Sequence, residues 1–173
     1  MTGVQTCALP ISVLYKRSWW VVNQLRSCRN NAKWEDFDKL ASDLLLKFTD
    51  ADTQIAIKLE QGMMAYYQNL PDRALQLIDD AFNFMSEAKN PQLMAGRGFF
   101  YQAEILRTQG SLGEAEFCVD LAEQNIAACE TDLDTSLIAW ERATILTDFT
   151  GRTTHRSLKL VNRSEERRVG KEC

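Results

Sequence analysis

The residues that could support catalysis are few and poorly placed. His155, the sole histidine of the 173-residue chain, stands in GRTTHRS, a composition typical of a turn. A general base of this kind needs a nucleophile and an orienting partner within hydrogen-bond reach. The sequence supplies no convincing candidate for either role, so we expect neither a catalytic residue nor an enzymatic activity.

Metal, disulfide and nucleotide chemistry is also poorly supported. The five cysteines include no CxxC pair and none has a histidine nearby, which argues against a zinc site and a disulfide framework. Cys118 and Cys129 share one expected helical stretch about three turns apart, too far to form a disulfide. Gly96-Arg97-Gly98 superficially suggests a phosphate loop, but it lacks a preceding strand and the remaining glycine spacing. We therefore expect no cofactor and no metal.

The two ends of the chain differ in composition from the rest. Residues 163–173, RSEERRVGKEC, are basic and almost free of apolar side chains, whereas residues 1–12, MTGVQTCALPIS, carry no charge. A basic tail normally suggests phosphate binding. Both ends, however, resemble translated sequencing adapters, residue for residue over 2–11 and 163–173. We expect both ends to be foreign and residues 13–162 to be an internal segment of a longer protein. If the tail is genuine, it is the best indication of function in the sequence.

The charge balance argues against binding to a phosphate backbone. The formal net charge is −4, and it stays mildly acidic without the two ends. No apolar run approaches the length needed to cross a bilayer. We expect a cytoplasmic protein without a membrane partner and without nucleic acid as its main ligand.

The pattern of apolar residues predicts helices throughout residues 13–162. Stretches such as Ala74–Met85 and Ala115–Ala127 place apolar side chains three and four residues apart, as in an amphipathic helix. Pro71 and Pro91 fall between such stretches, where proline suits a turn or a first helical position. No stretch alternates as a strand would. The recurring breakers divide the segment into about eight helices, the last incomplete; they lie at residues 28–32, 49–53, 69–72, 89–92, 109–113, 130–134 and 150–153.

An internal repeat of about 41 residues relates these helices. Small and branched aliphatic residues recur at this spacing, and so do residues suited to a turn. The matched pairs are Gly62 with Ala103, Asn69 with Gly110, Ala74 with Ala115, Ile78 with Val119, and Ala81 with Ala122. Adding the same spacing again takes Phe99 to Trp140 and Gly110 to Gly151.

This pattern resembles the tetratricopeptide repeat in a long-helix variant. Residues 61–81 and 99–122 carry the resemblance well, and residues 140–151 carry the first helix of a further unit. The resemblance implies an all-α fold, a right-handed superhelical solenoid of antiparallel helix hairpins. We expect about four hairpins in residues 13–162, the last incomplete, and self-association through uncapped ends.

The resemblance also implies where a partner binds. In this family the first helix of each hairpin lines a concave groove, and arginine and tyrosine side chains there suit protein contacts. The function expected is a non-catalytic scaffold that holds a peptide or protein. The alternatives are a sensor or regulatory array of a larger, possibly NTPase-linked signalling protein and, less favoured, an RNA-binding repeat protein. The groove residues expected from the repeat register are Tyr66, Tyr67, Arg97, Tyr101, Glu104, Arg107 and Arg142.

Overall fold

The computed structural model describes residues 11–127, 129 and 132–150, and every regular element among them is helical. The all-α prediction is therefore confirmed for this part of the chain. His155, the expected eighth helix and the adapter-like ends lie outside the described residues, except that the first helix begins at Ile11. The elements are α1 (Ile11–Asn30), α2 (Trp34–Lys47), α3 (Ala51–Tyr67), α4 (Pro71–Phe82), the 3₁₀ turn η1 (Met85–Glu87), α5 (Pro91–Thr108), α6 (Leu112–Ile126) and α7 (Asp132–Thr150).

Local signals in the sequence explain where several helices begin and end. Asp50 caps α3, because its carboxylate accepts hydrogen bonds from the Thr53 amide at 3.0 Å and the Thr53 hydroxyl at 2.7 Å. Pro71 and Pro91 occupy the first positions of α4 and α5, where a missing N–H costs nothing. The stripe that predicted a helix as far as Met85 overruns its end, since α4 stops at Phe82.

The turn between α3 and α4 and the turn between α5 and α6 share one backbone feature. Asn69 has a φ of 63° and Gly110 a φ of 83°, so both adopt the left-handed conformation after the end of a helix. Asparagine and glycine are the residues that tolerate this conformation best. The two positions matched by the 41-residue spacing are therefore structurally equivalent.

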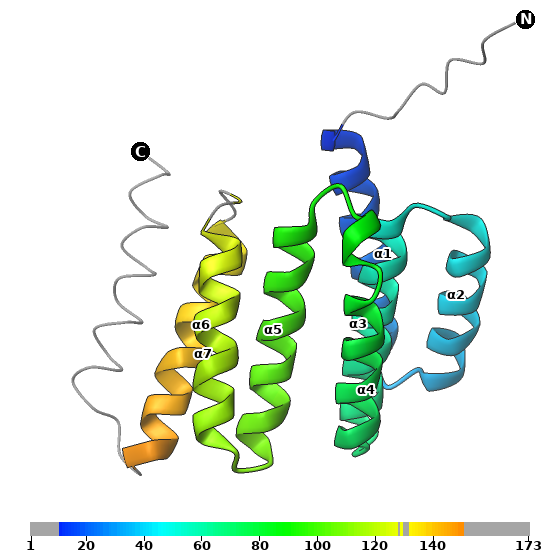
Figure 1. Cartoon of the computed structure of the whole chain (residues 1–173). Coiled ribbons are helices and arrows are strands. Elements are labelled where there is room, and N and C mark those ends of the chain that lie inside the picture. The colour runs from blue at the N-terminus through cyan, green and yellow to red at the C-terminus, as the bar shows by residue number, and fades with distance from the viewer. Residues whose placement is uncertain (1–10, 128, 130–131, 151–173) are drawn as a thin grey trace, which may run out of the picture.

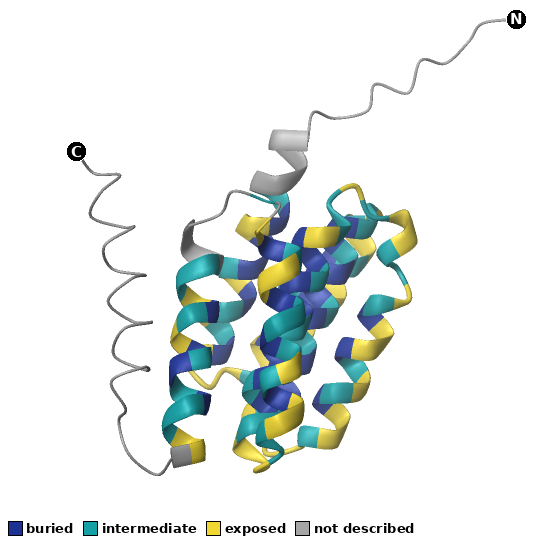
Figure 2. Cartoon of the chain, turned by 60° about the vertical axis from the view of Figure 1, so that its left-hand side comes forward, coloured by how far each residue is buried: buried dark blue, intermediate teal, exposed yellow. Residues whose placement is uncertain are grey.

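The helices pack in a regular order along the chain. Within each pair, α1 contacts α2, α3 contacts α4 and α5 contacts α6. Each odd-numbered helix also contacts the next odd-numbered one, from α1 through α3 and α5 to α7, and each even-numbered helix contacts the odd-numbered helix that follows it. Figure 1 shows the helices side by side, and Figure 2 shows their buried residues gathered on the facing sides.

Small residues allow the helices of a pair to approach closely. Ala74, Ile78 and Ala81 on α4 are fully buried, and so are their counterparts Ala115, Val119 and Ala122 on α6. Opposite α4, a Cβ added to Gly62 would lie 2.8 Å from Ile78 Cγ1 and 3.1 Å from the carbonyl oxygen of Ala74. The residues that carry the repeat in the sequence are thus those that form the contact between paired helices.

A second close approach joins neighbouring pairs, where α5 crosses α4. A Cβ at Gly98 would lie 2.4 Å from Phe82 Cε1 and 2.7 Å from Phe82 Cζ. The Phe82 ring is held in place by Phe99, whose ring centroid is 4.9 Å away. It therefore has little freedom to move aside for a larger residue.

In the Gly98→Ala variant, overpacking against Phe82 should cost about 2 kcal/mol, and the higher helix propensity of alanine should return about 1 kcal/mol. We therefore expect the variant to be less stable than the parent by about 1 kcal/mol. Urea unfolding followed by circular dichroism measures the change. Gly113→Ala in α6 is the matched control, since a Cβ there meets nothing within 4 Å. Equal stability of the two variants would contradict the close approach.

Candidate functional site: a polar face on the odd-numbered helices

The centre of the site is the buried carboxylate of Glu60 on α3, which is 1% exposed. Arg26 Nε on α1 donates to Glu60 Oε1 at 3.0 Å, and Arg29 Nη1 donates to Oε2 at 2.7 Å. The Tyr101 hydroxyl on α5 donates to Oε1 at 2.5 Å and accepts from Arg26 Nη2 at 2.5 Å. One carboxylate therefore joins three helices that are distant in sequence.

The protonation of this cluster follows from its burial and its charges. Burial, followed by the charge of Glu60, raises the pKa of the Tyr101 hydroxyl well above its usual range. Burial alone would lower the pKa of Arg26, but the oxygens of Tyr101 and Glu60 outweigh it, so the net shift is upward. Arg26 therefore stays charged and the Tyr101 hydroxyl keeps the proton that it donates to Glu60.

A second arginine and glutamate pair repeats this arrangement between α5 and α7. Arg107 Nε donates to Glu141 Oε1 at 2.6 Å, and Arg107 Nη1 donates to Asp148 Oδ2 at 3.2 Å. The separation in sequence between Arg107 and Glu141 is 34 residues, the same as between Arg26 and Glu60. The contact of α1 with α3 and that of α5 with α7 thus use the same donor, acceptor and spacing.

Two tyrosines at the end of α3 extend this polar region. The guanidinium of Arg29 lies over the ring of Tyr67, 5.1 Å from its centroid, which is within the range of a cation–π contact. Arg29 Nε is buried and has no hydrogen-bond acceptor. Tyr66 contacts Tyr67 edge to face, with ring centroids 5.4 Å apart. Tyr67 is 51% exposed, so one aromatic surface remains open to a partner.

Glu104 on α5 lies near charges contributed by several helices. Burial, followed by the charge of Glu141, raises the pKa of its carboxyl, while Arg29 and Arg107 act in the opposite direction. With Glu60 as a weaker contributor, its charged neighbours come from α1, α3, α5 and α7. We call the set formed by these side chains the polar face: Arg26, Arg29, Glu60, Tyr67, Tyr101, Glu104, Arg107 and Glu141.

The groove residues expected from the sequence fall into two groups. Tyr67, Tyr101, Glu104 and Arg107 belong to the polar face, with Tyr66 beside it. Tyr101 is only 5% exposed, because its hydroxyl is engaged by Glu60 and Arg26. The face therefore presents mainly the other members of this group to a partner.

Arg97 and Arg142 lie elsewhere. Arg97 lines a small apolar recess between α5, α6 and α7, together with Phe100 and Ile126. Along the helix it lies about 15 Å from Arg107. Arg142 on α7 contacts Asp120 Oδ1 at 2.6 Å and Glu123 Oε2 at 3.0 Å, both on α6. These two arginines are thus separate from the polar face.

The acidic and basic residues at the centre of the face were not anticipated from the sequence. Glu60 stands between Leu59 and Gln61 in IKLEQGMM, where a single glutamate is typical of the solvated side of a helix. The usable signal was the pair Arg26 and Arg29, three residues apart and so on one side of α1. The repeated separation of 34 residues between arginine and glutamate was a second signal.

Among the helices that the structure describes, none is both long and apolar enough to cross a membrane. Within the same residues, no group of three or more histidine, cysteine, aspartate or glutamate side chains is arranged to hold a metal ion.

Replacing the central carboxylate should be costly. The Glu60→Gln variant leaves two arginines against a neutral amide, and we expect it to lose about 3 kcal/mol of unfolding free energy. Urea unfolding at pH 7 measures the loss. Glu87→Gln, at an exposed position, is the control and should change stability by less than about 0.5 kcal/mol. A similar small loss in both variants would show that Glu60 is not the centre of the cluster.

The raised pKa of Glu104 predicts a pH-dependent effect. A carboxyl whose pKa is higher in the folded than in the unfolded protein stabilises the fold at low pH, and this contribution is lost as the pH rises through the folded pKa. Glu104→Gln should therefore be more stable than the parent at pH 7, by less than about 1 kcal/mol, with the difference vanishing near pH 4. Urea unfolding at both pH values tests this. A variant less stable than the parent at pH 7 would contradict it.

Comparison with protein-family models gives no match to this chain, and comparisons with curated proteins and with solved structures give none either.

Proposed function

We propose that this chain is a non-catalytic scaffold that binds a peptide or a protein on its polar face. In this proposal the helix pairs are successive units of a tetratricopeptide-like solenoid, and the odd-numbered helices form the side on which the partner lies. The observation that carries the proposal is the repeated contact between odd-numbered helices, in which Arg26 with Glu60 and Arg107 with Glu141 have the same spacing.

The order of helix contacts supports an array of equivalent units. In a solenoid each unit touches only its neighbours, so contacts should join a helix to its partner and to the next unit. The contacts described above follow this rule, and the left-handed residues Asn69 and Gly110 occupy equivalent turns. Self-association through the ends of the array remains a prediction of the same proposal.

The chemistry of the polar face supports binding of a peptide. Tyrosine and arginine dominate the energy of many interfaces, because they combine a large contact area with directional hydrogen bonding. The face offers the half-exposed ring of Tyr67 beside the charged groups of Glu104 and Arg107. Charges of both signs occur there, which suits a polar peptide better than a uniformly charged phosphate backbone.

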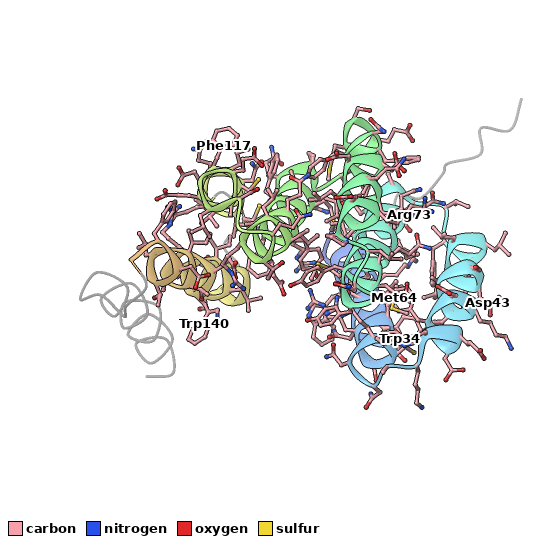
Figure 3. The ribbon with its side chains drawn as sticks, turned by 90° about the horizontal axis from the view of Figure 1, so that it is seen from below. Trp34, Asp43, Met64, Arg73, Phe117 and Trp140 are labelled. Carbon is pink, nitrogen blue, oxygen red and sulfur yellow. The ribbon has the colours of Figure 1, made fainter. Side chains whose placement is uncertain are left out.

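Selection from a random peptide library displayed on phage tests the proposal. The selected peptides should bind the parent chain, and Tyr67→Ala should weaken binding about tenfold or more. Phe117→Ala is the matched control, since Phe117 on α6 is also an exposed aromatic residue, at 62%. Figure 3 shows Phe117 and Trp140 projecting on opposite sides of the α6 and α7 pair.

The outcomes separate the proposal from its competitors. Binding that Phe117→Ala weakens as much as Tyr67→Ala does would reject the polar face as the site. Failure to select peptides, combined with RNA binding that falls steeply with salt, would favour the RNA-binding alternative.

A further inference from the structure

A hollow lies where α3 and α5 end. It has a volume of about 370 Å³ and is lined by Tyr66, Tyr67, Asn69, Pro71, Thr108 and Gln109. These residues come from the last turn of α3, the turn to α4 and the end of α5. The volume suits one long side chain or a small ligand. Because Tyr67 also belongs to the polar face, the hollow adjoins the surface on which we place the partner.

The polarity of the surrounding helices favours a positive charge in this hollow. Tyr67 and Thr108 are the last residues of α3 and α5, and the carboxyl end of a helix carries a partial negative charge. The amino end of α4 would act in the opposite sense. However, its first residue is Pro71, which has no N–H to offer an anion, and Asp72 follows in the same turn.

The lining side chains fit a cation as well. The rings of Tyr66 and Tyr67 are electron-rich surfaces for a guanidinium or an ammonium group, and Arg29 already uses the Tyr67 ring in this way. Asn69 and Gln109 add amide oxygens, which accept hydrogen bonds from such groups. No lysine or arginine is among the residues that line the hollow.

The charged groups around the hollow do not oppose this assignment. Glu60 is shared by Arg29, 2.7 Å away, and Arg26, and the charge of Glu104 offsets part of the remaining positive charge of Arg29. Burial, followed by the charge of Glu104, raises the pKa of the Tyr67 hydroxyl, while the charge of Arg29 lowers it. Asp72 lies close by, since its carboxylate accepts from Gln109 Nε2 at 3.5 Å.

We propose that this hollow holds a cationic side chain, the guanidinium of an arginine or the ammonium of a lysine, from the peptide bound on the polar face. The inference rests on the proposed scaffold function and names the chemistry of one anchor of the partner. An arginine or lysine near one end of the bound peptide would place its side chain in the hollow. The two tyrosines would line one side of it and the end of α5 the other.

Titration of the full chain, labelled with ¹⁵N and followed by NMR, tests the proposal. The probe is acetyl-Gly-Arg-Gly-amide, and its control is the same peptide with citrulline, which has nearly the same shape as arginine but no charge. The side-chain amide signals of Asn69 and Gln109 should shift and saturate with the arginine peptide. The citrulline peptide should bind at least about tenfold more weakly.

Two variants complete the test. Tyr67→Leu should weaken the arginine peptide about fivefold to tenfold, because it removes a ring from the hollow. Thr108→Lys places a fixed cation at the end of α5, and it should abolish probe binding without lowering the melting temperature. Thr144→Lys is the matched control on α7, where the threonine hydroxyl also bonds a backbone carbonyl. It should leave probe binding unchanged.

An equal response to the two peptides, or shifts confined to acidic surface residues such as Asp79 and Asp80, would overturn the cation site. So would a destabilised Thr108→Lys variant that still binds the probe. If selected peptides bind the polar face with neither arginine nor lysine near the hollow, the site fails and the scaffold stands. If the arginine peptide binds the hollow but no library peptide binds the face, the scaffold fails instead.

Discussion

A buried negative charge on Glu60 is the constraint on which the arrangement of the first three helix pairs depends. A carboxylate removed from water must be matched by hydrogen bonds and opposite charge, or it destabilises the fold. Its partners come from α1 and α5, so it is satisfied only when both helices hold one position against α3. Because ion pairs of this kind add little net stability compared with apolar packing, we infer that Glu60 chiefly specifies the register between pairs.

Much of the fold could be predicted from the sequence because its determinants are local. Pro71 and Pro91 mark helix starts, and Asn69 and Gly110 mark turns. The small residues at Ala74 and Ala115 mark the contact between paired helices, which the 41-residue spacing predicted. The end of α4 was not predicted, because the apolar stripe continues into residues that pack from the 3₁₀ turn rather than from a helix.

The polar face was predicted only in part, because its geometry depends on contacts between distant residues. The register placed Tyr67, Glu104 and Arg107 on one side of the odd-numbered helices, and the structure brings them near one another. It did not indicate that Tyr101 would be engaged by Glu60, nor that Arg142 would turn toward α6. Which contacts Tyr101 and Arg142 make depends on side-chain length and on the partners within reach. Helical periodicity gives information about neither.

The packing of Phe82 against Gly98 has a mechanical consequence. Where α4 meets α5, the closely held ring of Phe82 lies against the bare backbone at Gly98. This contact resists compression. The link from Arg107 to Asp148 between α5 and α7 differs, because both side chains are partly exposed and salt weakens such an ion pair. The contact of α4 with α5 should therefore be insensitive to ionic strength, whereas the exposed link between Arg107 and Asp148 should not.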